Sequence, residues 1–269
     1  MNSSVATRKW VFTAAALTLC SSLHLYAREV SVPDFRFQVK AYYLQELILS
    51  CDLFLCSSDI CLFKPHRRSS LSFSYCYSCQ SHVPPRCSHC FSCNVCILRR
   101  DHHCTLLGQC LGYQNYRYFL CLLLHGSVAL LYGCVINADV VLSLLQEGTS
   151  VQAMLLLLLP WLMLLMGQVN ITIFIFAFVT DVCIVGFLFC TGFLLFHSLL
   201  ALRGQTTNEW FEGDRQYDLG WKDNLREVLG NQGHLVWFMP FIASPLPGDG
   251  ITFRTKCPQS EPLPKSRDL

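Results

Sequence analysis

The chain has 269 residues, of which 52% are hydrophobic and 14% are charged, and its formal net charge is +2. A soluble domain carries about 25% charged residues, so this composition indicates a membrane protein. A net charge so close to zero gives no electrostatic basis for binding nucleic acid, which we exclude as a partner.

Two apolar stretches predict an N-terminal transmembrane hairpin within residues 1–74. The stretch at 10–26 is just long enough to cross a bilayer, which takes about 20 mostly apolar residues. No clear small-residue cleavage site follows it, so we interpret it as a span and not as a signal peptide. The stretch at 41–63 is a second candidate span, although acidic residues interrupt it and each costs roughly a few kcal/mol inside a membrane.

The next segment, residues 75–117, carries cysteine and histidine at the spacing of zinc ligands. It contains two C-x2-C pairs, which chelate zinc well, and a further dense set of ligands. Iron–sulfur clusters favour all-cysteine sets, and no βαβ pattern surrounds the pairs as a redox motif would require. The predicted ligands, enough for two structural Zn²⁺ ions, are Cys76, Cys79, His89, Cys90, Cys93, Cys96, His103 and Cys110.

The spacing alone does not assign the closing ligands to the two zinc ions. Either C-x2-C pair can be completed by two of the four remaining ligands. The segment also has few large aliphatic side chains with which to build a core. Zinc would therefore supply its folding free energy, on the order of 10 kcal/mol per site.

One cysteine near the end of this segment, Cys104, is not needed as a ligand and follows an acid and a base. A free thiol has a pKa of about 8.5, and a neighbouring base increases its thiolate fraction. His102 is a candidate base, and Asp101 could hold its tautomer, as in Cys-His-Asp systems. Cys104 is therefore either a nucleophile or a redundant cysteine, whereas Cys87 has no such neighbours and we interpret it as structural.

Apolar runs within residues 118–202 predict a C-terminal pair of transmembrane helices. The runs at 118–142 and 171–202 are long enough to cross a bilayer. A third run, at 154–167, is short for a span and suits an interfacial or re-entrant segment.

The flanking charges favour two crossings over three. Arg117 and Arg203 bracket a stretch that contains no other lysine or arginine. Positive residues stay on the cytosolic side, so an even number of crossings must join the two ends. Four polar groups in or near the runs are typical of helix packing, of interfacial positions or of a cavity lining. They are His125, Asp139, Asp181 and His197.

Residues 203–269 form a predicted cytosolic tail, which ends in Pro/Gly-rich and polar sequence for which we expect little order. Together the regions predict a mainly α, polytopic membrane protein. It would have about four transmembrane helices and a small cytosolic zinc-binding domain rich in cysteine.

Over residues 76–119 the sequence resembles the DHHC family of protein S-acyltransferases, or palmitoyltransferases. The similarity rests on the ligand spacing and on the tetrad Asp101-His102-His103-Cys104. Two further motifs follow in order. Thr206-Thr207-Asn208-Glu209 matches the TTxE motif after the last span, and residues 224–230 match the C-terminal NxxxVxG pattern.

The resemblance implies a ping-pong reaction in which Cys104 is the nucleophile, His102 its base and Asp101 the partner that orients the base. Cys104 would take a long-chain acyl group from palmitoyl-CoA and pass it to a cysteine of a substrate protein. The resemblance also implies which residues bind each zinc. One set is Cys76, Cys79, His89 and Cys96, and the other is Cys90, Cys93, His103 and Cys110.

The partners implied are membrane lipid, long-chain acyl-CoA and cytosolic or membrane proteins with cysteines near the membrane. The protein would be an integral multi-pass membrane protein of the endoplasmic reticulum or Golgi, with its active site facing the cytosol. Arg99 and Arg100 are candidates to bind the CoA phosphates through charge-assisted hydrogen bonds. A solvated or lipid-headgroup-facing position is the alternative for both.

The chain departs from the family pattern beside the nucleophile. Most members have Pro-Trp after the tetrad and Asn before the last ligand cysteine, where this chain has Thr105, Leu106 and Gln109. Val83 stands where a basic residue is expected. All eight ligands, the acid, the base and the nucleophile are kept, so we predict an active enzyme. The alternative is a catalytically inactive, membrane-anchored zinc scaffold that binds partners; a RING-type ubiquitin ligase would have no use for the spare thiol.

Overall fold

The computed structural model describes residues 74–147, 150–240 and 242–256. The two predicted N-terminal spans fall in residues 1–73, outside the described part of the chain. The described residues belong to two compact units. Residues 118–196 form one, called the helical unit below, and residues 74–117 with those from His197 onward form the other, called the cysteine-rich unit.

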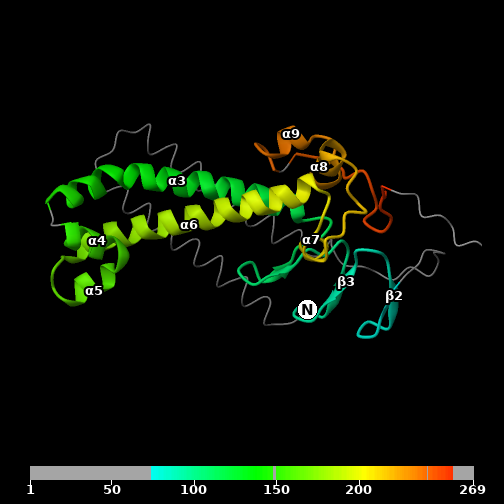
Figure 1. Ribbon diagram of the computed structural model, residues 1–269, viewed down its shortest axis with the longest axis horizontal. Helices are drawn as coiled ribbons and strands as arrows, with labels where there is room; N and C mark the ends of the chain where they lie inside the picture. The colour runs from blue at the N-terminus through cyan, green and yellow to red at the C-terminus, as the bar shows by residue number, and fades with distance from the viewer. Residues whose placement is uncertain (1–73, 148–149, 241, 257–269) are drawn as a thin grey trace, which may run out of the picture. The chain divides into compact units, whose positions relative to one another are not determined.

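Two long antiparallel helices, α3 (Tyr116–Glu147) and α6 (Ile171–Leu202), make up most of the helical unit and lie side by side (Figure 1). Both are almost wholly apolar, and a helix satisfies its own backbone hydrogen bonds where water is absent. Within the described residues, Tyr116–Val135 and Ile171–Leu202 are long and apolar enough to cross a membrane, by length and composition. The structure therefore contains two candidate membrane helices, in the region where the sequence predicts the C-terminal pair.

Small residues bring α3 and α6 close together. A Cβ added to Gly133 of α3 would stand 2.8 Å from the sulfur of Cys183 on α6. A Cβ added to Gly186 of α6 would stand 3.1 Å from the side chain of Leu130 on α3. Such close approach of backbones is how helices gain packing contacts in a membrane, where the hydrophobic effect between them is absent.

Between the long helices the apolar segment forms two short helices, α4 (Ser150–Leu158) and α5 (Pro160–Leu165). Pro160 separates them because it lacks an N–H and disfavours a helical conformation at the residue before it. Neither helix approaches the roughly 20 residues that a span requires. Trp161 of α5 packs edge-on against Phe174 of α6, with ring centroids 4.5 Å apart. That residues 154–167 lie at or in the membrane without crossing it stays a prediction.

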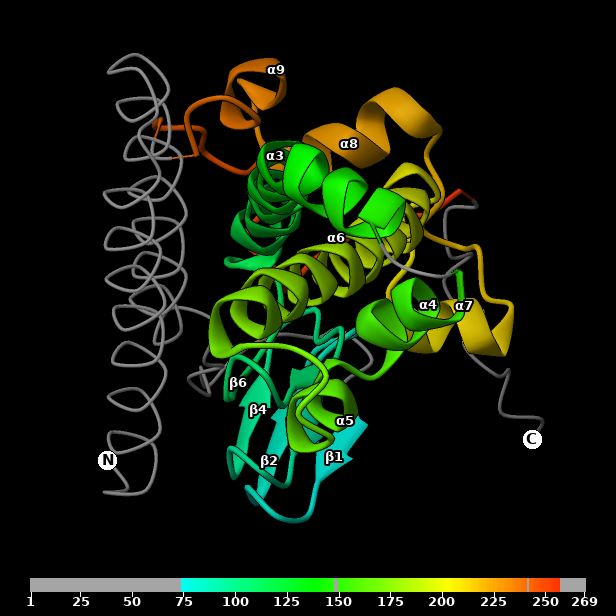
Figure 2. The same ribbon diagram turned by 90° about the vertical axis from the view of Figure 1, so that its left-hand side faces the viewer.

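Three separate antiparallel hairpins form the first half of the cysteine-rich unit (Figure 2). Their strands are two or three residues long, because ligand spacing and not a sheet-wide hydrophobic pattern sets the chain's path. The pairs are β1 (Ser74–Cys76) with β2 (Ser81–Val83), β3 (Ser88–Cys90) with β4 (Val95–Ile97), and β5 (His103–Cys104) with β6 (Gln109–Cys110).

The hairpin register brings predicted metal ligands opposite each other. His89 faces Cys96 across β3–β4, and His103 faces Cys110 across β5–β6. In the β1–β2 and β3–β4 hairpins, a C-x2-C pair begins at the last residue of the first strand and is followed by a residue with positive φ, Gln80 in the first hairpin (φ 49°) and Asn94 in the second (φ 55°). A left-handed residue at these positions turns the chain back after each pair of cysteines.

The core of the cysteine-rich unit is small and includes the C-terminal segment. One cluster contains the buried side chains of Val83, Cys96 and Tyr113, and Ile251 and Phe253 pack against it. The expectation of little order in the tail is therefore wrong for this segment, which the apolar Ile251 and Phe253 anchor. Residues 257–269 lie outside the described part of the chain.

Three short helices complete this unit: α7 (Thr207–Glu212), α8 (Trp221–Leu229) and α9 (Gly233–Val236). Asn224 of α8, the first residue of the NxxxVxG match, is buried and donates from Nδ2 to the carbonyl oxygen of Leu202, at 2.8 Å. Its Oδ1 accepts from the backbone N–H of Leu219 at 2.9 Å. The motif thus ties α8 to the last residue of α6.

Candidate active site and metal centres

The first metal centre consists of the ligand atoms of Cys76, Cys79, His89 and Cys96, which all lie within 4.8 Å of one another. The Nδ1 atom of His89 is 3.2 Å from the sulfur of Cys79 and 3.9 Å from that of Cys96. The sulfurs of Cys79 and Cys96 are 3.5 Å apart. These four atoms surround a space about the size of one metal ion.

The second metal centre consists of the ligand atoms of Cys90, Cys93, His103 and Cys110. The Nδ1 atom of His103 is 3.6 Å, 3.3 Å and 3.6 Å from the sulfurs of Cys90, Cys93 and Cys110. The sulfurs of Cys93 and Cys110 are 3.7 Å apart. The two sets are those that the resemblance implies, and they interleave along the chain.

These distances fit zinc. Tetrahedral coordination with Zn–S of about 2.3 Å and Zn–N of about 2.0 Å places ligand atoms roughly 3.5–3.8 Å apart. A disulfide would place two of the sulfurs only about 2.05 Å apart, so none of these contacts is a disulfide. Cys87 and Cys104 belong to neither set. Cys87 is buried in the apolar cluster, and burial raises the pKa of its thiol to about 12, so it behaves as a packing residue.

Cys104 lies at the end of β5, next to the second metal centre, and interacts with the base that precedes it. The Nδ1 atom of His102 is 2.6 Å from Oδ2 of Asp101, a charge-assisted hydrogen bond. The second ring nitrogen of His102 is then available for the hydrogen bond between its side chain and that of Cys104. The structure thus places Asp101, His102 and Cys104 in the order acid, base, thiol.

The surroundings of these three groups shift their pKa values so that the carboxylate and the thiolate are favoured as anions and the imidazole as a cation. Burial alone would raise the pKa of Asp101, but hydrogen bonds with His102 and Thr207 and nearby charge leave it below its usual value. Burial would lower the pKa of His102, yet its contacts with Asp101 and Cys104 raise it to about 9. Burial would raise the pKa of Cys104, while His102 and the N–H groups of the following turn hold it below its usual value. The arrangement favours an imidazolium–thiolate pair.

The TTxE match holds Asp101 in place. Thr207 donates to the carboxylate twice, from its backbone N–H to Oδ1 at 2.9 Å and from its hydroxyl to Oδ2 at 2.8 Å. Thr206 and Glu209 form a capping box that begins α7 at Thr207, and this fixes the direction of the Thr207 N–H.

Glu209 has a second partner, Arg86, from the loop between β2 and β3. The Nε and Nη2 atoms of Arg86 each donate to a carboxylate oxygen of Glu209 at 2.7 Å, and both side chains are nearly buried. The guanidinium also lies 4.2 Å from the ring centroid of Tyr217. Such a bidentate, stacked arginine connects the metal-binding hairpins to the segment after α6.

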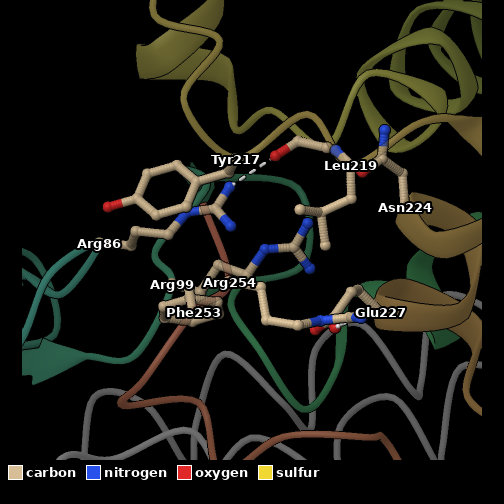
Figure 3. Close-up of a pocket in the computed structure, with 9 residues that line it drawn as sticks. Arg86, Arg99, Tyr217, Leu219, Asn224, Glu227, Phe253 and Arg254 are labelled. Atoms are coloured by element: carbon tan, nitrogen blue, oxygen red, sulfur yellow. Dashed lines mark hydrogen bonds and ion pairs between the residues drawn. The ribbon is translucent and has the colours of Figure 1, made fainter. Parts of the chain in front are cut away.

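The two arginines predicted to bind CoA phosphates lie in different surroundings. Arg99 is 5% exposed and lines a cavity of about 10 Å³, room for one water, together with Arg86 and Arg254 (Figure 3). Its Nε has no hydrogen-bond partner among the described residues, and burial beside Arg86 lowers its pKa to about 10. Arg100 is partly exposed, and its side chain forms a hydrogen bond with the thiol of Cys110, a ligand of the second metal centre.

The site also contains a histidine that no motif assigns to it. The sequence favours a packing, interfacial or cavity-lining role for His197, and the structure places it against Asp101 and His102, where it is 2% exposed. Tyr116, which no motif singled out, contacts it. The helical phase of α6 indicated neither contact, because partners 81 to 96 positions away leave no local pattern.

A family model described as DHHC palmitoyltransferase matches residues 69–214. The chain is 52% identical over 217 residues to a rat protein named "Probable palmitoyltransferase ZDHHC24", covering 80% of this chain and 76% of that protein. It is 56% identical over 180 residues to a zebrafish protein of the same name, covering 67% of this chain and 61% of that protein. An Arabidopsis thaliana protein named "Probable protein S-acyltransferase 6" is 28% identical, over 71% of this chain and 41% of that protein.

Proposed function

The chain belongs to the DHHC palmitoyltransferase family, and we propose that Cys104 is the nucleophile of its acyl-transfer reaction. As a member of this family the protein is a protein S-palmitoyltransferase. The observation that carries the assignment is that Cys104, outside both metal sets, is hydrogen-bonded to a histidine that Asp101 orients.

In the first half-reaction, His102 takes the proton of Cys104, and the thiolate attacks the thioester carbonyl of palmitoyl-CoA. The bond between the carbonyl carbon and the CoA sulfur breaks, and CoA leaves as a thiol with the proton from His102. In the second half-reaction, His102 takes the proton of a substrate cysteine, whose thiolate attacks the acyl-Cys104 thioester and releases Cys104. One thioester replaces another, so positioning and thiolate activation are the main requirements.

Two Zn²⁺ ions fold the segment that carries Cys104, one in each set of three cysteines and one histidine. The ligand distances support this assignment, and so does the small apolar core of the unit. Each ion would supply folding free energy on the order of 10 kcal/mol. Zinc has no part in the acyl transfer itself, because all four ligand positions at each site are filled by protein.

The acyl donor is a long-chain acyl-CoA, whose phosphates Arg99 and Arg100 bind. The unpartnered Nε of the buried Arg99, at a cavity shared with two further arginines, supports an anion at this place. The 10 Å³ cavity has to open to admit a phosphate. The helical unit, with two candidate membrane helices, would hold the apolar acyl chain.

The complete protein would have about four spans, the first two within residues 1–74, and its active site would face the cytosol of the endoplasmic reticulum or Golgi. Residues 75–117 would form the cytosolic zinc-binding domain, residues 118–202 the C-terminal transmembrane pair, and residues 203–269 the cytosolic tail. Its protein substrates would be cytosolic or membrane proteins with cysteines near the bilayer surface, since Cys104 would lie close to that surface.

The experiment that tests this function is autoacylation with palmitoyl-CoA in detergent, with hydroxylamine-sensitive label counted per zinc-replete chain. Cys104→Ala should take up no label. Cys87→Ala is the matched control, because Cys87 is a non-ligand cysteine of the same unit, and it should keep the label. Equal labelling of Cys104→Ala and the parent would instead support the inactive scaffold, with passive acylation of other cysteines.

A further inference from the structure

We propose that His197 is a positioning residue for acyl transfer, acting through Asp101 together with Tyr116. This proposal rests on the proposed role of Cys104. His197 belongs to α6, more than 90 positions after the tetrad, and no sequence motif of the site includes it.

His197 approaches the same carboxylate oxygen of Asp101, Oδ2, that accepts from the hydroxyl of Thr207. The Nδ1 atom of His197 is 3.9 Å from Oδ2 of Asp101, and both side chains are 2% exposed. The ring of His197 also lies beside that of His102, with centroids 5.3 Å apart and planes at 30°. His197 therefore contacts both the acid and the base and is shielded from water.

Tyr116 fixes the orientation of the His197 ring. Its hydroxyl donates to the backbone carbonyl oxygen of His197 at 3.3 Å and lies 3.0 Å from Nδ1 of the same residue. We assign the ring proton to Nδ1, because the carboxylate of Asp101 lies 3.9 Å from that nitrogen; the Tyr116 hydroxyl then accepts from Nδ1–H and donates its own proton to the carbonyl. The N–H of His197 then lies between the hydroxyl oxygen of Tyr116 and the carboxylate of Asp101, with its positive end toward both oxygens.

The cluster of Asp101, His102 and His197 also contains enough donor atoms for a metal ion, but its geometry is that of a hydrogen-bonded network. The 2.6 Å between Nδ1 of His102 and Oδ2 of Asp101 is well below the roughly 3.3 Å that separates nitrogen and oxygen ligands of one tetrahedral zinc. Both oxygens of Asp101 already accept hydrogen bonds from Thr207. We therefore assign His197 to positioning and not to metal binding.

A buried carboxylate keeps its position only when donors surround it. Thr207 contacts Asp101 from α7 and His197 contacts it from α6. Without His197, Asp101 would lose one of these contacts and gain freedom, and the His102 ring that it orients would lose alignment with Cys104. The expected defect is in the rate of acyl transfer and not in the affinity for acyl-CoA.

The test is single-turnover acylation of zinc-replete protein at saturating palmitoyl-CoA. His197→Leu should lower the saturating rate roughly tenfold or more, a fraction of the 10²–10⁴ that a complete acid–base group contributes. The concentration of acyl-CoA at half-maximal rate should stay unchanged. His197→Asn should restore most of the rate, because its amide N–H can replace Nδ1–H. Leu199→Ala, at a partly exposed position on the same helix, is the control and should match the parent.

A double-mutant cycle separates positioning from general packing. In the Asp101→Asn background, His197→Leu should cost little further rate, since residues that act as one unit are not additive. Full additivity, an unchanged rate in His197→Leu, or equal defects in the Leu and Asn variants would overturn the proposal. Failure of the proposed function is distinct, because the parent protein itself would then form no acyl-enzyme.

Discussion

Thr207 donates two hydrogen bonds to Asp101, one from its backbone and one from its hydroxyl, across 106 positions of sequence. The contact connects the first residue of α7 to the acid of the Asp-His-His-Cys tetrad. It gives the TTxE match a physical role, because the capping box that starts α7 also directs the N–H of Thr207 at the carboxylate.

Thr207→Val removes the hydroxyl donor and keeps the backbone donor and the shape of the side chain. A hydrogen bond to a charged group contributes about 1.5–3 kcal/mol, so we expect the saturating acylation rate to fall at least about tenfold. Thr206→Val, the matched control, should instead lower thermal stability through loss of the cap, by about 1 kcal/mol, with a smaller effect on the rate. Equal rate losses in the two variants would contradict the separate roles of the neighbouring threonines.

Arg86→Met should destabilise the cysteine-rich unit more than any change at an exposed arginine. It leaves Glu209 buried without its cation, and breaking a buried pair in this way costs about 3–5 kcal/mol. Arg254→Met breaks a pair whose arginine is 60% exposed, which contributes roughly 0–1 kcal/mol. Thermal unfolding of the zinc-loaded protein measures both. A similar melting temperature for the two variants would show that the Arg86–Glu209 pair does not join the hairpins to α7.

The zinc content of cysteine variants tests which residues belong to the two ligand sets. Cys79→Ala removes a ligand of the first set, so we expect elemental analysis to find one zinc per chain where the parent has two. Cys87→Ala changes a nearby cysteine of neither set and should keep both ions. Two zinc ions in Cys79→Ala, or one in Cys87→Ala, would mean that the first set is assigned incorrectly.

Gly112→Ala should displace the backbone that supports Asp101. A Cβ on Gly112 would stand 2.7 Å from the backbone carbonyl oxygen of Leu98, which cannot move as a flexible side chain would. Overpacking of this kind costs roughly 1–3 kcal/mol and shifts the backbone. Because the N–H of Asp101 bonds to the carbonyl of Leu111 beside it, the acylation rate should fall together with the stability. Gly248→Ala, which meets only ordinary contacts, is the control for both measurements.

The metal ligands could be predicted from sequence because C-x2-C spacing is a local property. Their division into two sets could not, since β3 carries a ligand of each centre, His89 and Cys90, and only the resemblance implied the pairing. Asp101, His102 and Cys104 were recognisable because acid, base and thiol stand within four positions. The family assignment from these motifs agrees with the matched family model.

Contacts between residues that are distant in sequence could not be predicted from it. The length of the apolar run at 171–202 predicts a spanning helix, but not that His197 meets Asp101 near its end. The packing of Ile251 and Phe253 on the hairpins was also not predicted, because two apolar residues in a Pro/Gly-rich tail form no period. Long-range contacts of this kind, made by single side chains, depend on the assembled unit.

The measurement that tests the central claim most directly is mass spectrometry of the acyl-enzyme before and after a cysteine-containing peptide is added. The parent protein, loaded with palmitoyl-CoA and freed of excess donor, should carry the palmitoyl group on the fragment that contains Cys104. The group should then leave that fragment and appear in equal amount on the peptide. Palmitoyl found only on other cysteines, or palmitoyl on Cys104 that the peptide does not remove, would contradict acyl transfer through Cys104.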